Sequence, residues 1–396
     1  MGASRLNTHP IGFVGAGQLA RMAGEAASAL GLSMAVLAEH PGDAACGVAA
    51  EVVLGSPFVA EDLQALADRC DVVTFDHEQV DLDLVTALAA QGVVVRPGAA
   101  TLELAVDKAR MRTVLDEAGV PVPVYLVVDE GPGAIDAVEG FAAAHGWPVM
   151  VKAARGGYDG KGVWPVADRT EAARVLAGVA GQIVVEELLP LQAELAVVVA
   201  RRPSGAAAAW PAVETAQVGG VCREVLVPGR MEADVLEAAS ALGQKVAEIA
   251  GGVGVMAVEL FWSGGRLLVN EVATRPHNSG HWTMEGAVAS QFENHLRAVS
   301  DLPLGSTAPQ HPQVASVNVF GGPDGADPAD LLALGLAVEG AHVHLYGKQA
   351  RPGRKLGHVT VCGDDAEVVR SQAWSAAIAL GTPVPDGVTL PAGLAR

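Results

Sequence analysis

The stretch Pro148–Trp164, PVMVKAARGGYDGKGVW, carries more information about this chain than any other. Its short apolar run, Val149–Val151, predicts a buried strand, and Lys152 follows at once. The loop that comes next has four glycines and the polar residues Arg155, Tyr158, Asp159 and Lys161. Glycines let backbone N–H groups approach a bulky anion, and lysines bring charge to a phosphate chain. Because the P-loop pattern G-x-x-x-x-G-K-S/T is absent, the stretch predicts either another kind of nucleotide-binding loop or a β-hairpin with solvated charges.

Composition limits the class of protein. A chain of 396 residues, 50% hydrophobic and 4% aromatic, suits an α/β enzyme with two or three domain cores. The formal net charge of -19 argues against unassisted binding to nucleic acid or to an anionic membrane. The sequence has no apolar run of about 18 residues and no signal-peptide core in its first ten, so a cytoplasmic protein is expected. The four cysteines lack a C-x-x-C spacing, which predicts buried free thiols.

Positive charge is concentrated locally in this acidic chain. Of its six lysines, only Lys245 lies outside the stretches that other features single out. One such stretch, Gly347–His358 (GKQARPGRKLGH), is a basic turn that is either a phosphate clamp or a solvated surface. Another, Thr101–Ala118, predicts a pair of helices in which Lys108 supplies a cation from outside the glycine loop.

Residues 11–98 alternate between strand and helix patterns, which predicts a doubly wound parallel sheet that GVVVRPG at 92–98 closes. A first glycine turn, with Gly15, Gly17 and Ala20, fits G-x-G-x-x-G/A. Together with Glu39 after the second strand, this turn favours a nicotinamide enzyme. A helix N-terminus there would equally bind a substrate phosphate, to which Gln18 can add its amide.

The segment Thr74–Val80, TFDHEQV, ends a strand of this sheet. In an open parallel sheet that edge is where ligands bind. We therefore expect Glu78 to contact substrate, whereas Asp76 is expected to cap a helix.

Residues 183–189, IVVEELL, predict a strand followed by a linker whose backbone groups suit an adenine edge, and Glu194 suits ribose hydroxyls. From the residues alone, solvation at the strand end is the favoured explanation for both. Helices are expected at 133–146 and 169–180. Residues 310–396 are rich in strand patterns and end with a helix at 367–379.

A second informative region is the predicted β-hairpin of Val255–Leu260 and Leu267–Glu271 around the turn SGGR. A three-residue loop would put Glu259 and Glu271 on the same face, whereas a two-residue loop would put them on opposite faces. On one face, Glu259, Asn270 and Glu271 form an oxygen-rich cluster that suits Mg²⁺ beside a phosphate chain. The alternative is two exposed acids on a surface hairpin.

Directly after this hairpin, Ala273–Thr283 reads ATRPHNSGHWT. No amphipathic period explains so many polar residues, and Pro276 and Gly280 interrupt regular structure. We interpret this segment as part of an active site, in which His281 is expected to be a hydrogen-bonded structural residue.

Together these stretches resemble the ATP-grasp superfamily and, within it, the 5-(carboxyamino)imidazole ribonucleotide synthases of purine biosynthesis. The motifs that carry the resemblance are RGGYDGKG at Arg155–Gly162, NEVATRPHNSGHWT at Asn270–Thr283 and GRKLGH at Gly353–His358. The resemblance implies a doubly wound N-terminal domain (1–104), an ATP-grasp domain (105–305) and a small C-terminal domain (306–396). It also implies an ATP-dependent carbon–nitrogen ligase that carboxylates aminoimidazole ribonucleotide with bicarbonate through carboxyphosphate, requires Mg²⁺, and forms a homodimer.

The resemblance also assigns roles to individual residues. Those implied to bind ATP are Lys108, Lys152, Tyr158, Asp159, Gly160, Lys161, Gly162, Glu186, Glu187, Leu188, Leu189, Glu194, Asn270 and Glu271. Those implied to hold Mg²⁺ are Glu259 and Glu271. Those implied to act at the carboxyphosphate are Arg275, His277 and Asn278, with Lys355 also catalytic. Those implied to surround the ribonucleotide are Gln18, Glu78, Tyr158, Arg354 and Lys355.

The chain departs from the family pattern at a few positions. It has DHEQ at Asp76–Gln79 where the family often has EFEN, and Gln217 where a histidine is common. Thr274 replaces a usual proline, which is expected to loosen the backbone before Arg275. The alternatives are a formate-using ribonucleotide transformylase, a biotin carboxylase, a nicotinamide dehydrogenase and a catalytically silent paralogue.

Overall fold

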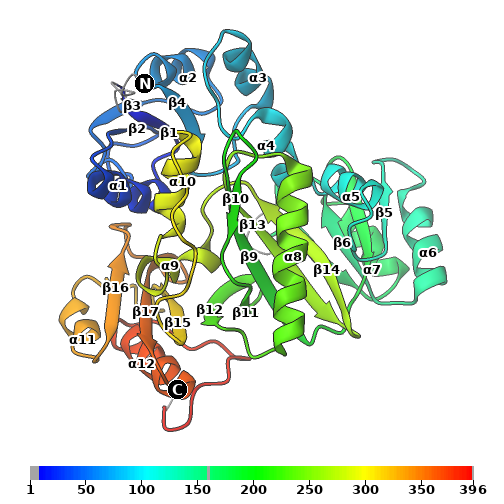
Figure 1. The fold of residues 1–396 in the computed structure, drawn as a ribbon. Coiled ribbons are helices and arrows are strands. Elements are labelled where there is room, and N and C mark those ends of the chain that lie inside the picture. Colours follow the sequence, from blue (N-terminus) through cyan, green and yellow to red (C-terminus); the bar gives the residue numbers. More distant parts are fainter. Residues whose placement is uncertain (1–8, 158–160, 395–396) are drawn as a thin grey trace.

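The structure is a computed structural model that describes residues 9–157 and 161–394. Three sheets organise these residues, in the strand orders β3-β2-β1-β4, β5-β8-β6-β7 and β14-β13-β9-β11-β12-β15-β17-β16, with β10 beside β9. Figure 1 shows the first sheet at the N-terminal end of the molecule and the second in a lobe beside the large central sheet. The two lobes and the central sheet match the α/β and α+β organisation predicted above.

The N-terminal unit is a parallel sheet covered by helices, as the alternating pattern predicts. Its elements are β1 (Ile11–Val14), α1 (Gln18–Leu30), β2 (Met34–Ala38), β3 (Glu51–Leu54), α2 (Ala60–Ala67), β4 (Val72–Phe75) and α3 (Leu82–Ala90). Pairing of β1 with β2 and with β4 is parallel. The expected closing strand at 92–98 is reduced to a single bridge between Val95 and Val73, because Pro97 has no N–H with which to continue the pairing.

The predicted pair of helices leads into the smaller lobe. The elements are α4 (Ala99–Val106), α5 (Lys108–Glu117), β5 (Tyr125–Val128), α6 (Ala134–His145), β6 (Val149–Ala153), β7 (Val163–Val166), α7 (Arg169–Leu176) and β8 (Ile183–Glu187). Strands β6 and β7 form the hairpin that carries the glycine loop. Its base is narrow, because a Cβ on Gly157 would lie 2.6 Å from the carbonyl oxygen of Lys161.

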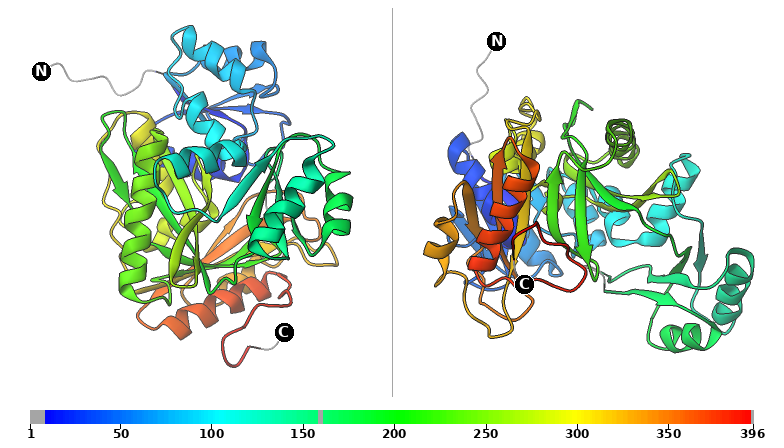
Figure 2. Two further views of the ribbon diagram at one scale, coloured as in Figure 1. Left: turned by 90° about the vertical axis from the view of Figure 1, so that its right-hand side faces the viewer. Right: turned by 90° about the horizontal axis from the view of Figure 1, so that it is seen from below.

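The central sheet runs without a break from the predicted ATP-grasp region into the C-terminal region. Its strands are β9 (Ala193–Arg201), β10 (Ala207–Ala209), β11 (Val213–Val218), β12 (Val221–Val227), β13 (Gly254–Ser263), β14 (Arg266–Ala273), β15 (Gln313–Phe320), β16 (Ala341–Leu345) and β17 (Lys355–Gly363). Helix α8 (Ala233–Ala250) covers one face, and α12 (Ala366–Ala379) packs on the C-terminal strands with α11 (Leu332–Leu336) nearby (Figure 2). Antiparallel pairing of β12 with β15 joins the two regions, so the C-terminal strands extend the central sheet.

A β-bulge in the β13–β14 hairpin settles the question of parity. The turn is the two-residue Gly264–Gly265, both with positive φ, and it pairs Ser263 with Arg266. By itself this turn would put the two acids on opposite faces. The register shifts by one between Glu259 and Leu260, so that Asn270 is the extra residue and Glu259 lies directly opposite Glu271. The acids therefore share a face by a route that loop length alone did not indicate.

The segment after β14 joins the N-terminal unit to the central sheet. It contains η1 (Asn278–Gly280), α9 (Thr283–Gly286) and α10 (Gln291–Val299), which lies beside α1 and above α9 in Figure 1. Apolar side chains of α10 pack in the same core as strands β1 and β2. On the same helix, Nδ1 of buried His295 accepts from Val255 N at 3.1 Å, and its Nε2 lies 2.9 Å from Thr74 Oγ1. The described part of the chain contains no helix long and apolar enough to span a membrane.

Candidate functional site

A buried ion-pair cluster lies behind the glycine loop. Lys152, near the end of β6, places Nζ 2.7 Å from Oε2 of Glu186 on β8, and Arg112 Nε on α5 lies 2.7 Å from Oε1. Burial alone would raise the pKa of Glu186, but Arg112 and Lys152 outweigh it and hold the pKa at about 2. Glu186 is only 2% exposed, so solvation at the strand end does not explain it. A charged cluster this deep holds Lys152 rigidly toward β14.

Both predicted phosphate-binding lysines converge on the bulge of β14. Lys152 Nζ donates to Oδ1 of Asn270 at 3.2 Å, and Lys108 Nζ pairs with Oε1 of Glu271. Lys108 is the first residue of α5, which Asp107 caps. The backbone N–H of Lys108 donates to Ala154 O at the start of the glycine loop. Burial alone would raise the pKa of Glu271, whereas the Lys108 ammonium lowers it and prevails. Two cations and an oxygen-rich strand thus face each other across the two sheets.

The opposed pair Glu259 and Glu271 fits a divalent cation. Two carboxylates in direct register on neighbouring strands, with the Asn270 amide beside them, are a hard oxygen donor set. Mg²⁺ is usually held by one or two carboxylates together with substrate phosphates, so a cage made only of protein ligands is not needed. Among the described residues, no group of three or more His, Cys, Asp or Glu side chains could hold a metal ion by itself. Side-chain exposures of 21% for Glu259 and 41% for Glu271 leave both accessible.

Arg275 is held by Glu78 from the N-terminal unit. Its Nε lies 2.7 Å from Glu78 Oε2, and Thr274 N donates to Glu78 Oε1 at 3.0 Å. Proline could not make the second bond, so Thr274 ties this backbone down instead of loosening it, and the expectation above is wrong. Glu78, expected to contact substrate, thus has a side chain already engaged with the segment that follows β14.

His277 faces Glu259 as a neutral imidazole. Its Nε2 lies 3.6 Å from Glu259 Oε1, while Nδ1 lies 2.8 Å from Ser279 Oγ and accepts from Ser279 N at 3.4 Å. Burial, with help from Arg275 and Lys355, lowers its pKa to about 3. Because Nδ1 is an acceptor, the ring proton belongs on Nε2, where it faces the site. The next residue, Asn278, has its buried Oδ1 without a hydrogen-bond partner among the described residues.

Only one of the two ring nitrogens of His281 has a hydrogen-bond partner among the described residues. His281 is 1% exposed, and its Nδ1 lies 3.1 Å from Nε2 of Gln291, as expected of a hydrogen-bonded histidine. Its Nε2, however, has no partner within the described residues, and its ring lies 4.8 Å from that of His358.

The predicted adenine and ribose positions lie along β8 and β9. Glu187 pairs loosely with Arg266 at 3.7 Å, and Leu188 is 41% exposed, so this linker has an accessible side. Leu189 is half-buried beside it. Glu194 lies on the same face of the central sheet as Glu259, and burial raises its pKa to about 7. These residues are open enough to meet a ligand, and Glu194 is not a simple solvated acid.

The basic turn reaches the N-terminal unit. Lys348 Nζ donates to Oε1 of Gln18, the first residue of α1. Arg354 Nη1 donates to Gln349 O at 3.0 Å, and Lys355 Nζ lies 6.0 Å from the centre of the Phe320 ring. The turn therefore brings Lys348 to the first residue of α1. Lys355 lies close enough to His277 to help lower the pKa of that imidazole.

The first glycine turn already holds an anion. Asp76 Oδ2 accepts from Gly17 N at 3.0 Å, and its Oδ1 accepts from Ala20 N at 2.7 Å. Asp76 thus caps α1 from the end of β4, and a Cβ on Gly17 would lie 2.3 Å from that carboxylate. A pyrophosphate would compete with this carboxylate for the same N–H groups, which argues against a nicotinamide enzyme.

Some positions carry no structural test, and others went unnoticed in the sequence. Tyr158, Asp159 and Gly160 lie outside the described residues, whereas Lys161 and Gly162 stand at the described end of the loop. Arg112 and Gln291 were not singled out. No local signal could have found Arg112, because nothing in the polar helix sequence KARMRTVLDE sets it apart from Arg110.

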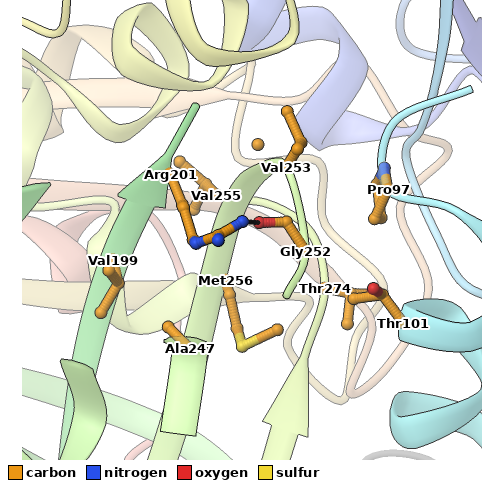
Figure 3. A pocket seen from close by; sticks show the side chains of 11 residues that line it. Pro97, Thr101, Val199, Arg201, Ala247, Gly252, Val253, Val255, Met256 and Thr274 are labelled. Carbon is orange, nitrogen blue, oxygen red and sulfur yellow. Dashed lines mark hydrogen bonds between the residues drawn. The ribbon is translucent and has the colours of Figure 1, made fainter. Parts of the chain in front are cut away.

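A hollow lies behind the segment that holds Arg275, separate from the candidate site (Figure 3). Most of its lining is apolar, and Arg201 on one side lies with Nη1 3.5 Å from Gly252 O. Thr274 and Thr101 also line it. The guanidinium of Arg201 is bonded to a backbone carbonyl, so the residues that line the hollow do not form a cluster of reactive groups.

The fold and the site together define an ATP-grasp protein. The family model described as the ATP-grasp domain matches residues 113–292, the ribonucleotide synthetase preATP-grasp domain matches 8–106, and the phosphoribosylaminoimidazole carboxylase C-terminal domain matches 315–372. The chain belongs to the N5-carboxyaminoimidazole ribonucleotide synthase family. A protein of that name from Mycobacterium leprae (strain TN) is 44% identical over 374 residues, which cover 90% of this chain and 84% of the relative.

Solved structures support the same assignment. The N5-carboxyaminoimidazole ribonucleotide synthetase from Thermus thermophilus is 38% identical with a TM-score of 0.83, covering 92% of this chain and 97% of its own. The synthase from Aspergillus clavatus, solved in complex with ADP and 5-aminoimidazole ribonucleotide, is 29% identical with a TM-score of 0.86, covering 95% and 99%.

Proposed function

We propose that this protein is an ATP-dependent carbon–nitrogen ligase that carboxylates 5-aminoimidazole ribonucleotide with bicarbonate, giving N5-carboxyaminoimidazole ribonucleotide for purine biosynthesis. The observation that carries the proposal is the convergence of Lys108 and Lys152 on Asn270 and Glu271, with Glu259 directly opposite. Cations for a phosphate chain and acids for its counter-ion thus meet between two sheets. The relatives named above supply the substrate class.

At the ATP end, the residues of this chain neutralise and position. Phosphoryl transfer depends mainly on those two effects. Lys108 and Lys152 hold the phosphates, and the loop from Tyr158 to Gly162 covers them. The segment Glu186–Leu189 holds adenine and Glu194 the ribose. The Glu186 carboxylate acts indirectly, since it is engaged with Arg112 and Lys152.

Glu259 and Glu271 would hold Mg²⁺, which when bound neutralises charge on the phosphate chain. In this structure Glu271 pairs with Lys108, so the lysine must share or release that carboxylate when a cation is bound. The Asn270 amide, already bonded to Lys152, lies beside both acids and keeps the lysine near the bound phosphates.

In the reaction, a bicarbonate oxygen attacks the γ-phosphorus, and ADP leaves with the former bridging oxygen. The exocyclic amine then attacks the carboxyl carbon of carboxyphosphate and displaces phosphate, or it attacks CO₂ that carboxyphosphate has released together with phosphate. In either case the amine loses a proton. Arg275, His277 and Asn278 face the developing charge. Gln18, Glu78, Arg354 and Lys355 surround the ribonucleotide. Carboxyphosphate hydrolyses readily, so the covering loop must exclude water.

Further properties follow from the family. The chain is proposed to divide at 1–104, 105–305 and 306–396, to form a homodimer and to work in the cytoplasm. It is proposed to act on small molecules and to bind neither nucleic acid nor membrane. The net charge of -19 supports the last point.

The test is ADP release measured with each reactant omitted in turn. We expect release to require aminoimidazole ribonucleotide, bicarbonate and Mg²⁺, and to be unaffected by NAD. Equal ADP release without the ribonucleotide would overturn the substrate assignment, and ADP release without bicarbonate would overturn the carboxylation.

A further inference from the structure

The side chain of Gln291 grips the backbone of His277 at both ends. Its Oε1 accepts from His277 N at 2.8 Å, and its Nε2 donates to His277 O at 2.7 Å. Gln291 is 0% exposed, and it touches the segment from behind, away from solvent. Both polar backbone groups of a candidate active-site residue are thus satisfied by one side-chain amide.

The same amide also fixes His281. Since Oε1 is an acceptor and one hydrogen of Nε2 goes to His277 O, the second hydrogen points to His281 Nδ1, 3.1 Å away. The Gln291 amide packs closely against the backbone of Gly280, because a Cβ on Gly280 would lie 2.4 Å from Gln291 Oε1. Three hydrogen bonds and a close packing contact therefore depend on an amide at this position.

Gln291 is itself firmly anchored. Its backbone N–H donates to Thr283 Oγ1 at 2.9 Å, and that hydroxyl donates to Gly280 O. The helix that begins with Gln291 packs Phe292 and Leu296 into the core shared with the N-terminal sheet. The amide is thus mounted on a rigid element that spans two parts of the molecule.

We propose that Gln291 is a positioning residue for the second stage of the reaction, in which carboxyphosphate or CO₂ must be held until the amine attacks. It acts through the backbone of His277 and through His281, and it does not touch substrate. The inference rests on the proposed function of the segment Arg275–Asn278. Loss of this grip lets His277 move while the elements that hold adenine and ribose stay in place.

The same helix provides a matched control. Asn294, also 0% exposed, grips Gly305 in the same way: Gly305 N donates to its Oδ1 at 2.7 Å, and its Nδ2 donates to Gly305 O at 3.1 Å. Gly305 lies on the connection to the C-terminal strands and carries no candidate site residue. Asn294→Asp and Gln291→Glu therefore replace equivalent buried amides, of which only one supports the site.

The experiment compares both variants with the unmodified protein in kcat, in KM for ATP, in melting temperature, and in ADP released per bicarbonate fixed. Gln291→Glu keeps the size and the acceptor but loses at least one of the two donated bonds, because a carboxyl group carries at most one hydrogen. We expect its kcat to fall by about 10- to 100-fold, with KM for ATP within about twofold. We also expect more ADP per bicarbonate fixed. Asn294→Asp should lower the melting temperature comparably and keep kcat within about twofold.

A second variant disturbs the amide without changing it. Gly280→Ala pushes a methyl group against Gln291 Oε1, and we expect the same fall in kcat and the same excess of ADP. If Gln291→Glu does not fold, Gly280→Ala decides the question. The proposal is overturned if these variants keep the kcat and coupling of the unmodified protein, or if Asn294→Asp loses as much kcat as Gln291→Glu. Failure of the proposed function would instead appear as absent ribonucleotide dependence in the unmodified protein.

Discussion

Two deeply buried glutamates in this molecule have different surroundings. Glu224 on β12, 1% exposed, accepts from Arg370 through both oxygens at 2.7 and 3.0 Å and from Trp374 Nε1 at 2.8 Å. Glu186 on β8, 2% exposed, is paired with Arg112 and Lys152, which come from two different elements. The partners of Glu224 both belong to α12, one helical turn apart.

The difference separates a charge cluster that fastens a helix from one that leads to the proposed ligand site. The Glu224 cluster is complete, since Arg370 also donates to Thr389 O at 2.6 Å. The Glu186 cluster continues through Lys152 to Asn270, next to Glu271, whose side chain is 41% exposed. Burial of charge fastens α12 in the first case, whereas in the second the buried Lys152 leads to the accessible carboxylate of Glu271.

The largest expected effect is at the open end of the Glu186 cluster. Glu271→Gln removes a metal-site charge and the partner of Lys108, so we expect kcat to fall by about 1,000-fold or more, equivalent to about 4 kcal/mol. The variant should stay folded, with a lower melting temperature because Lys108, only 8% exposed, loses its anion. Steady-state ADP release and circular dichroism measure the two effects. Substantial retained turnover would remove Glu271 from the metal site.

The cluster around Glu224, which is closed because all its groups are paired, should behave in the opposite way. Glu224→Gln leaves Arg370 buried without its anion, and the free energy of unfolding should fall by about 3 kcal/mol. Neither kcat nor KM for ATP should change at a temperature where the variant is folded. Urea denaturation and steady-state kinetics test this, and a selective loss of ATP affinity would show that the two clusters are not separate in function.

The sequence predicted which residues make up the candidate site better than it predicted how they are arranged. Lys152 after a strand, Lys108 from a helix pair and two acids on a hairpin were all predictable from periodicity and turn residues. The alignment of Glu259 with Glu271 was not, because it needs the bulge at Asn270 as well as the Gly264–Gly265 turn. A bulge is set by the pairing of a strand with its neighbours, which local sequence does not reveal.

Long-range polar contacts were missed for a related reason. A helix cap was expected of Asp76, but the sequence did not indicate that the capped helix is α1, whose Ala20 N donates to Asp76 across 56 residues. Gln291 reaches His277 from the start of a helix that shows only an ordinary amphipathic pattern. The partners of Asp76 and Gln291 are distant in sequence, so the roles of these side chains become apparent only in the folded structure.

Glu194 provides a third case, a half-buried acid that forms no ion pair within the described residues. Burial raises its pKa from 4.5 to about 7, the reverse of the shift at Glu186. The folded state therefore binds the proton more tightly than the unfolded state does. Its contribution to stability is greatest below pH 4.5 and is lost as the pH rises toward 7.

Glu194→Gln should remove that loss. Without nucleotide, we expect the variant to exceed the unmodified protein in free energy of unfolding at pH 8 by on the order of 2 kcal/mol. At pH 4.5 the difference should nearly vanish. Urea denaturation at both pH values measures it. An equal difference at the two pH values would show that Glu194 does not titrate in this range.

The smallest effect concerns Glu78, which is intermediate between the open and closed clusters because one oxygen pairs with Arg275 and the other accepts from Thr274 N. Thr274→Pro restores the usual family residue and removes only the second bond, which should cost about 1 kcal/mol. A stiffer unfolded chain offsets part of that cost, by about 0.4–1 kcal/mol. Thr274→Ala keeps the N–H and serves as the control, so the proline variant should be slightly less stable than the alanine variant in urea denaturation. If the proline variant is instead the more stable of the two, the bond from Thr274 to Glu78 contributes nothing, and Glu78 is held by Arg275 alone.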